Sequence, residues 1–559
     1  MLDTRTAQPD TGFDPLATFD AAGVFARGLS ESAPEQAQAS LCSVLADVGD
    51  WRRLDPDRLQ ALRVLDIQGL RMLEALLAGY AAQGSQAQSQ NRRLARPAFE
   101  LCAAFAQAFE HVLKFLRDPK LHKGVLARTP DIIVRLMRYR EIEMALTLCQ
   151  YDTWQRARWK TLHDLYRFAR EHDVATAKVV IGQRNGGGEV SLTPQEVYLR
   201  ILLLDVAGGG QFLPAEIAAT RRSLARWAEG LALDPLQASP DAPPFERAGF
   251  CLDPDGMGGL SRAAPASVDG LLWLDTVPLS AAVDAEIASF RDSTDPNAAR
   301  HVLLLARLAP LYAPQPLKAK RRGERNEVAL ASVQVAFGGL QGIYRMLRDE
   351  ARHRSGRAAK VVPEVDEIVI GEAGVSPNRN RAPALVPMGA DDGSVNAFEA
   401  MTAAGNAWQV RDSSDSGCRL RGRAAELQHL LPGSLMAFRE NDDAPWRLVV
   451  VRRLRKILGT NVELGVERLG VGPQRIVLTD PNAPREASRK AGRTIAFYLP
   501  ESAACPRVPI KTLLVPADEY ASGRVMTMAS TRDFRVRMKE PLEQQAEFVW
   551  TSFEFVDGA

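Results

Sequence analysis

The sequence predicts an α+β multidomain protein, with a helical N-terminal region followed by two β-rich regions. Three observations support this class. Apolar residues recur at helical spacing up to about residue 310, alternate with a period of two after about residue 320, and then form many short strands separated by turn residues. At ~150 residues per domain, a chain of 559 residues has room for three or four units.

The N-terminal region, residues 1–312, is expected to be mostly helical. In ARPAFELCAAFAQAFEHVLKFLR, apolar side chains such as Phe105 and Phe109 recur every three or four positions and form one face. Thr193 is followed by proline, which predicts a helix that starts with an N-cap and a proline at its first position. Residues 235–267 are rich in proline and glycine and predict a long irregular connection.

Residues 313–470 predict a β-barrel that carries an insertion. The stretch EVALASVQVAFGG alternates with a period of two, which places Val333 and Val335 on one face of a strand. A helical pattern followed by a polar, turn-rich segment then indicates an insertion at about 341–405. Further strands are expected at AWQVRD, CRLRG, SLMAFRE, WRLVVVRRLRK and NVELGVERLG.

Residues 471–559 are expected to form a C-terminal β-rich domain. Strand patterns recur in QRIVL, TIAFYLP, KTLLVPA, VMTMAS and FVWTSFEFV. Many short strands of this kind with turn signals between them are typical of small barrels.

The charge balance excludes a general nucleic-acid coat. The chain has 70 basic and 68 acidic residues, a formal net charge of +2, so any anion site must be local. DNA is therefore not an expected partner. The N-terminus lacks the pattern of a signal peptide, and the run ILLLDVA is too short to span a bilayer, so we expect a cytoplasmic protein without membrane insertion.

The sequence also lacks the patterns of common enzyme and metal sites. No two cysteines form a CxxC pair, and neither HExxH nor GxSxG occurs, so no metal, cofactor or catalytic residue is expected. The glycine clusters at 186–188 and 208–210 do not have P-loop spacing and are read as loops.

Two polar motifs flank the predicted strands of the first barrel. AKRRGERNEVAL contains R-x-x-x-R, and VRDSSDSGCRLRG contains D-x-S-x-x-G; the residues concerned are Arg321, Arg322, Arg325, Asp412, Ser414 and Gly417. The R-x-x-x-R spacing recurs elsewhere, for example at Arg348/Arg352 and Arg419/Arg423. Neither motif alone therefore identifies a ligand site; the order of the two motifs and the strands that follow them do.

This order resembles the PilZ domain, a small β-barrel that binds cyclic di-GMP. The resemblance covers residues 318–340 and 405–470, and it ends in the strand LGVERL. The layout is also similar to large PilZ-containing proteins of β-proteobacterial type with a helical N-terminal region. The resemblance implies a cyclic di-GMP receptor, not an enzyme, that relays the messenger to motility, pilus or exopolysaccharide machinery through a protein partner.

The six motif residues suit such a ligand chemically. Arginine forks bind phosphate and the O6/N7 edge of guanine, and an aspartate accepts from the N1–H and N2–H donors of guanine. Ser414 can donate or accept, and Gly417 allows a positive φ or close approach by the ligand. Asp412 and Ser414 should point to the ligand side of the strand end, with Asp415 facing solvent.

Two other functions remain open at this stage. A ligand-free PilZ-like adaptor would bind protein partners through its helical region. An RNA-binding regulator would use the arginine run VVVRRLRK, which lacks the interleaved aromatic residues that stack on bases.

Overall fold

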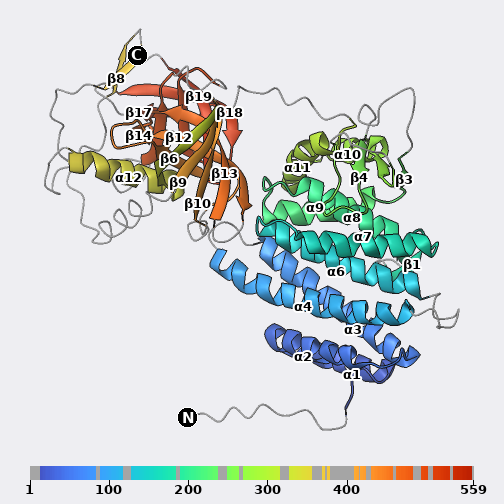
Figure 1. Ribbon diagram of the computed structural model, residues 1–559. Helices are drawn as coiled ribbons and strands as arrows, with labels where there is room; N and C mark the ends of the chain where they lie inside the picture. Colours follow the sequence, from blue (N-terminus) through green and yellow to red (C-terminus); the bar gives the residue numbers. More distant parts are fainter. Residues whose placement is uncertain are drawn as a thin grey trace, which may run out of the picture. The chain divides into compact units, whose positions relative to one another are not determined.

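The computed structural model divides into two compact units, Met1–Ala319 and Lys320–Ala559. The first unit is mainly helical and the second contains two barrels, which confirms the predicted α+β class (Figure 1). The structure describes residues 13–82, 88–117, 128–183, 189–236, 249–262, 269–291, 293–314, 326–354, 368–371, 374–377, 408–414, 416–423, 430–457, 461–481, 493–501, 508–528 and 533–556.

The helices of the first unit lie in successive layers (Figure 1). Their bounds are α1 Phe19–Glu31, α2 Pro34–Ala46, the 3-10 helix η1 Asp47–Asp50, α3 Pro56–Ala82, α4 Gln88–Leu116, α6 Thr129–Cys149, α7 Arg156–Glu171, α8 Pro194–Ala207, α9 Pro214–Trp227, α10 Val277–Phe290 and α11 Pro296–Tyr312. Helix α8 begins as predicted: the Thr193 hydroxyl accepts from the Glu196 N–H at 3.1 Å, and the Glu196 carboxylate accepts from the Thr193 N–H at 2.8 Å.

Helix α6 forms the centre of this unit, because nearly all of its side chains are buried. The predicted apolar face of α4 packs against it, and the ring of Phe105 stacks on that of Tyr139 with a centroid separation of 4.6 Å. Arg135 of α6 pairs with Asp66 of α3 inside the unit. Buried charges of this kind persist only when they are paired and hydrogen-bonded, so these contacts fix how the helices are arranged.

The expectation of an irregular connection over 235–267 is wrong in part. Strand β4, Gly249–Leu252, pairs with β5, Leu272–Asp275, which also pairs with β3, Asp234–Pro235. A second small sheet consists of β1, Val179–Gln183, and β2, Glu189–Leu192. Both sheets consist of strands of two to five residues, too short for a periodic pattern to reveal them.

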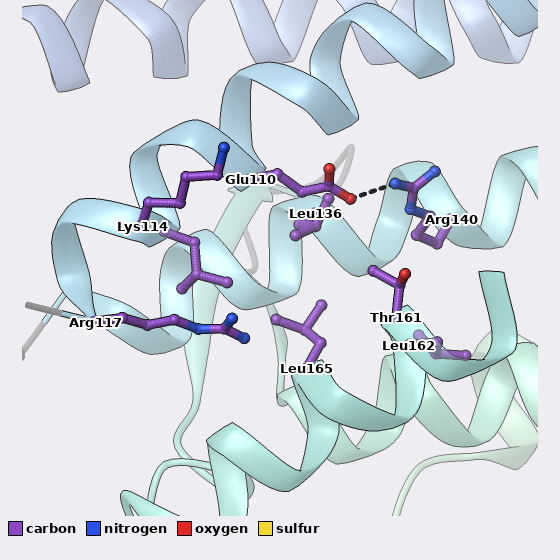
Figure 2. Close-up of a pocket in the computed structure, with 9 residues that line it drawn as sticks. Glu110, Lys114, Arg117, Leu136, Arg140, Thr161, Leu162 and Leu165 are labelled. Carbon is purple, nitrogen blue, oxygen red and sulfur yellow. Dashed lines mark hydrogen bonds and ion pairs between the residues drawn. The ribbon is translucent and has the colours of Figure 1, made fainter. Parts of the chain in front are cut away.

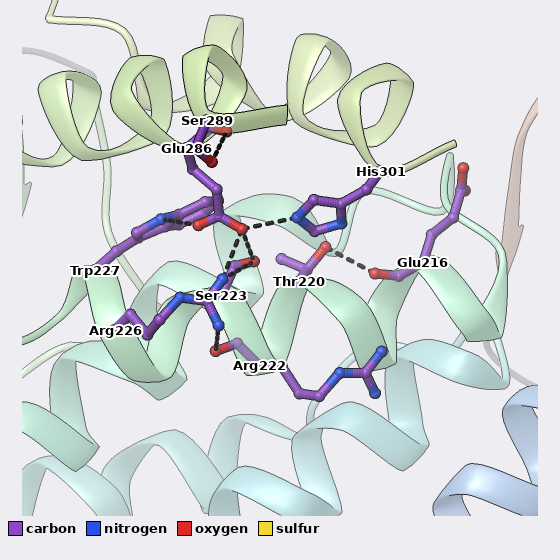
Figure 3. Close-up of polar contacts among 9 residues, drawn as sticks. All are labelled: Glu216, Thr220, Arg222, Ser223, Arg226, Trp227, Glu286, Ser289 and His301. Carbon is purple, nitrogen blue, oxygen red and sulfur yellow. Dashed lines mark hydrogen bonds and ion pairs between the residues drawn. The ribbon is translucent and has the colours of Figure 1, made fainter. Parts of the chain in front are cut away.

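A polar cluster at Glu286 joins the last helices of this unit (Figure 3). The carboxylate, on α10, accepts from Trp227 Nε1 at 2.8 Å and from Arg226 Nη2 at 2.6 Å, both on α9. His301 Nε2 of α11 lies 2.7 Å from the same carboxylate. One acidic side chain thus connects three helices.

The second unit contains two closed six-stranded barrels. The first has the strand order β10-β13-β12-β11-β6-β9 and the second β14-β15-β16-β19-β18-β17. The strands of the first are β6 Asn326–Ala336, β9 Trp408–Ser414, β10 Gly417–Arg423, β11 Leu435–Arg439, β12 Arg447–Lys456 and β13 Asn461–Val471. Those of the second are β14 Gln474–Thr479, β15 Arg493–Leu499, β16 Thr512–Pro516, β17 Val525–Met528, β18 Phe534–Gln544 and β19 Phe548–Phe555.

Strand β18 was not expected from the sequence. Its sequence FRVRMKEPLEQ is highly charged and contains Pro541, features that argue against a strand. The register of β18 against β19 shifts on both sides of Pro541, so the ladder accommodates the proline at an irregularity.

The segment after β6 contains helix α12, Gly339–Arg354, and the hairpin β7, Ile368–Gly371, with β8, Gly374–Pro377. Helix α12 contributes Ile343 and Tyr344 to a core that also includes Leu448 of the first barrel and Trp550 of the second. Most of the expected insertion beyond the helix, including residues 378–405, lies outside the described residues.

The two barrels also share an ion-pair cluster. Arg452 of β12 donates from Nε to Glu467 of β13 at 2.6 Å, and from Nη1 to Glu543 of β18 at 2.6 Å. The shared apolar core and this cluster together make the two barrels one compact unit.

Candidate functional site

The D-x-S-x-x-G motif forms the tight connection of the hairpin β9–β10. Leu420 is opposite Val410, and both side chains are buried inside the first barrel. The next pair is Arg419 opposite Asp412, so Arg411 is an extra residue on β9, a β-bulge. The bulge reverses the inside–outside alternation of β9 at this point and turns Asp412 to the outer face with Arg419.

Beyond the bulge, the register assigns the remaining motif residues to alternate faces. Ser413 is opposite Cys418, which is buried, whereas Ser414 is opposite Gly417. Asp412 and Ser414 therefore share the outer face, and Ser413 is on the inner one. Asp415 lies outside the described residues.

Asp412 forms an ion pair with Arg419, whose Nη2 lies 3.1 Å from Asp412 Oδ2. The aspartate side chain is 16% exposed and the arginine side chain 43% exposed. Gly465 of β13 pairs with Arg419 on one side and with Arg453 of β12 on the other. The outer face of the barrel thus carries a row running from Arg453 across a glycine to Arg419 and Asp412.

Ser414 stabilises the turn itself. Its hydroxyl donates to the Gly417 carbonyl at 3.1 Å and lies 3.4 Å from the Ser416 hydroxyl. The Arg468 N–H of β13 donates to the Ser416 carbonyl at 2.8 Å. These bonds hold the turn in the absence of any ligand, as serine side chains commonly do in turns.

Gly417 is required for a reason other than the one expected from the sequence. Its φ is not positive, so a left-handed conformation does not explain it. A Cβ at this position would stand 2.1 Å from the Val466 carbonyl oxygen of β13. The expectation of a positive φ is therefore wrong, whereas close approach by a ligand stays a prediction; the neighbouring strand gives glycine a packing requirement within the barrel.

Strand β6, which follows the R-x-x-x-R motif in the sequence, begins at the same corner of the barrel. Asn326, the residue that follows Arg325 in the sequence, pairs with Ser413, and Glu327 pairs with Asp412. Arg321, Arg322 and Arg325 lie outside the described residues. The structure therefore brings the first residues of β6 beside the D-x-S-x-x-G hairpin, although 85 to 87 positions separate the paired residues in the sequence.

Three further arginines contribute to this outer face and were not chosen from the sequence. In the sequence, Arg419 belongs to one of several R-x-x-x-R repeats and Arg453 to the run VVVRRLRK, and neither pattern assigns them to this site. Within the described residues, neither Arg421 nor Arg453 forms an ion pair. The alternation in CRLRG, with arginines on either side of a buried Leu420, was the available signal for an outward basic face.

The cysteine of this hairpin, Cys418, is not a reactive nucleophile. Burial raises the pKa of the Cys418 thiol to about 12, so at neutral pH it is a protonated, inert core residue. No group of three or more metal-ligating side chains occurs among the residues that the structure describes. Within the same residues, no helix has the length and apolar character needed to cross a bilayer.

Comparison with known families adds a finding for the helical unit. Residues 20–239 match a family model described as the N-terminal domain of the cyclic-di-GMP receptor FimW. The match spans α1 to β3 and covers less than half of the chain. Searches of curated proteins and of solved structures found no match.

Proposed function

We propose that this protein is a cyclic di-GMP receptor whose binding site is the outer corner of a PilZ-like first barrel. The observation that carries the proposal is the match of residues 20–239 to the N-terminal domain of a cyclic-di-GMP receptor family. The sequence motifs support the same ligand from a different part of the chain. The proposed division is a helical region at 1–312, the barrel at 313–470 and a C-terminal β-rich domain at 471–559.

The strand pairing at the hairpin supports the position of the site. Arg325 is joined by one peptide bond to Asn326, which pairs with Ser413 beside Asp412. In the proposed complex, Arg321, Arg322 and Arg325 bind the phosphates and the O6/N7 edge of a guanine. Arg419 and Arg453 add positive charge on the same outer face, where the ligand carries two phosphates.

Asp412 has the acceptor chemistry that guanine requires. An ionised carboxylate has about four acceptor positions, so the contact with Arg419 is compatible with acceptance from a guanine. The ion pair orients the carboxylate, and the proposed ligand donates its N1–H and N2–H to it. In this arrangement Ser414 and Gly417 act mainly by fixing the turn that presents Asp412.

The same ion pair is the observation that favours the alternative function. Arg419 pairs with Asp412 within the hairpin, and in an adaptor this pair would only hold the hairpin as a connector. In that case the helical region would be the interaction surface. Under both proposals the protein is not an enzyme, acts in the cytoplasm, and works through a protein partner, which for the receptor is in motility, pilus or exopolysaccharide machinery.

Calorimetric titration of the full chain with cyclic di-GMP, cyclic di-AMP and GTP tests the proposal. Adenine lacks the N1–H and N2–H donors of guanine, so cyclic di-AMP cannot donate these hydrogen bonds to Asp412, and a hydrogen bond to a charged group is worth ~1.5–3 kcal/mol. We expect cyclic di-GMP to bind most tightly. Equal heats for the two cyclic dinucleotides would contradict guanine recognition.

Arg321→Ala combined with Arg325→Ala should abolish binding of cyclic di-GMP. The matched control is Arg52→Ala with Arg53→Ala, which removes the same charge from two exposed positions of the helical unit. If the control weakens binding as much, the effect reflects net charge only. If the wild-type protein itself does not bind cyclic di-GMP, the adaptor proposal replaces the receptor proposal.

A further inference from the structure

A pocket of about 180 Å³ lies in the helical unit, and all of its lining residues belong to that unit (Figure 2). It is formed by the end of α4, the middle of α6 and the middle of α7. Its apolar surface comes from four leucines, Leu113, Leu136, Leu162 and Leu165. All four are almost fully buried, so they form a rigid floor that is already in place without a ligand.

The acidic groups at this pocket are already neutralised. Arg140 lines the pocket with a side chain that is only 4% exposed, and it pairs with both Glu110 and Glu143. Figure 2 shows the contact between Arg140 and Glu110 at the edge of the pocket. Arg158 also pairs with Glu143, at 3.2 Å, so two arginines balance the two carboxylates and leave little acidic charge to repel an anion.

Two further cations line the pocket near the end of α4, Lys114 in its last turn and Arg117 directly after it. Both are exposed, and neither forms an ion pair with a residue that the structure describes. The guanidinium carbon of Arg117 lies 4.8 Å from the ring centroid of Phe168. This cation–π contact holds the guanidinium beside the pocket.

Charge at a helix C-terminus gives a simpler explanation for these cations. Lys114 lies in the last turn of α4 and Arg117 directly follows it, where positive charge complements the partial negative charge of the carbonyl groups. That effect explains their presence on α4, but it predicts no binding in the pocket beside them. A binding experiment therefore separates the two explanations.

We propose that this pocket binds a small organic anion that has one ring-sized apolar group and a phosphate or carboxylate. The leucine floor takes the apolar group, and Lys114 with Arg117 binds the anionic group. The size fits, because an apolar cavity of about 150 Å³ accepts a benzene ring. The site is independent of the proposed cyclic di-GMP site, and a cyclic dinucleotide with two guanines exceeds its volume.

The test uses phenyl phosphate, benzoate and neutral benzyl alcohol, which share the ring and differ in the attached group. Binding to the full chain is measured by ligand-observed NMR titration. We expect at least one anionic probe to bind about tenfold more tightly than benzyl alcohol, and the tighter of the two identifies the anionic group. Equal affinity for all three probes, or no binding of either anion at millimolar concentration, would overturn the proposal.

The matched pair of variants locates the binding. Lys114→Gln with Arg117→Gln should weaken the binding of the anionic probe at least about tenfold. The control, Arg27→Gln with Arg222→Gln, removes the same charge from exposed positions on α1 and α9 and should leave this binding unchanged. All four side chains are exposed, so both variants should keep the thermal unfolding of the wild type. Equal weakening in both variants, or in neither, would refute the assignment to this pocket.

Discussion

Substitution of Gly417 by alanine tests how the β9–β10 hairpin is held against the barrel. The new Cβ would stand 2.1 Å from the Val466 carbonyl oxygen and 3.2 Å from the Glu467 Cα. Optimal contact between non-bonded heavy atoms lies at about 3.5–4.0 Å, so the two backbones must separate. Because the obstructing atom belongs to the backbone of β13, no change of side-chain rotamer relieves the clash.

The cost follows from the pairs that would open. Separation at Gly417 disrupts the first rungs of the β10–β13 ladder, Gly417↔Glu467, Cys418↔Val466 and Arg419↔Gly465. Two or three backbone hydrogen bonds at ~1 kcal/mol each, with up to ~1 kcal/mol from the partly exposed Asp412–Arg419 pair, give about 2–4 kcal/mol. Since ~1.4 kcal/mol changes an equilibrium constant tenfold, the equilibrium constant for local opening rises about 30- to 700-fold.

Hydrogen exchange measured by mass spectrometry reports this local opening directly. A melting temperature is less suitable, because the chain has two units and its unfolding need not be two-state. We expect faster exchange in peptides that cover β10 and β13 of Gly417→Ala, with weaker binding of cyclic di-GMP because the same hairpin presents Asp412.

Gly465→Ala is the matched control. Gly465 lies in the same ladder, but its new Cβ would meet only the Arg453 Cβ at 3.4 Å, close to ordinary van der Waals contact. Neither glycine has a positive φ, so backbone strain does not separate them. The reasoning is refuted if both variants lose protection equally, or if Gly417→Ala exchanges like the wild type.

Three further predictions concern single side chains. Asp412→Ala should weaken the binding of cyclic di-GMP about tenfold or more in a calorimetric titration, because a charge-assisted hydrogen bond is worth ~1.5–3 kcal/mol. Asp415→Ala should leave the affinity unchanged. A larger loss of affinity in Asp415→Ala than in Asp412→Ala would show that the assigned register is wrong. Burial raises the pKa of Glu286, but hydrogen bonds from His301 and Arg226 outweigh it and hold the pKa below 4.5, so its contribution to stability is present above about pH 4.5 and is lost as the pH falls through the lower folded-state pKa. Glu286→Gln should therefore lower the melting temperature near neutral pH and differ less from the wild type in acid; equal shifts at both pH values would contradict this. Burial raises the pKa of Asp205 from 3.8 to about 6, so ionisation of this carboxyl lowers the stability of the folded state by about 3 kcal/mol as the pH rises through this range. Asp205→Asn should therefore raise the melting temperature at neutral pH but not below about pH 4. A melting temperature below that of the wild type at neutral pH would refute this prediction.

Features that depend on residues within one or two turns were readable from the sequence. The N-cap predicted at Thr193 is confirmed, because its hydroxyl accepts from the N–H of Glu196, only three positions away. The alternation of β6 placed Val333 and Val335 on one face, and both are buried in the barrel. Helical and strand periodicity report which face is apolar, and that is enough for the fold class.

The partners of each strand were decided only by the tertiary structure. The bulge at Arg411 turns Asp412 towards Arg419, and nothing in the sequence RDSSDSG marks the extra residue. The need for glycine at position 417 arises from the Val466 carbonyl, about 50 positions further along the chain. Strand β18 forms despite its charges and proline, because closure of the second barrel supplies pairing partners on both sides. Register and closure are set by contacts between segments distant in the sequence, so local patterns cannot specify them.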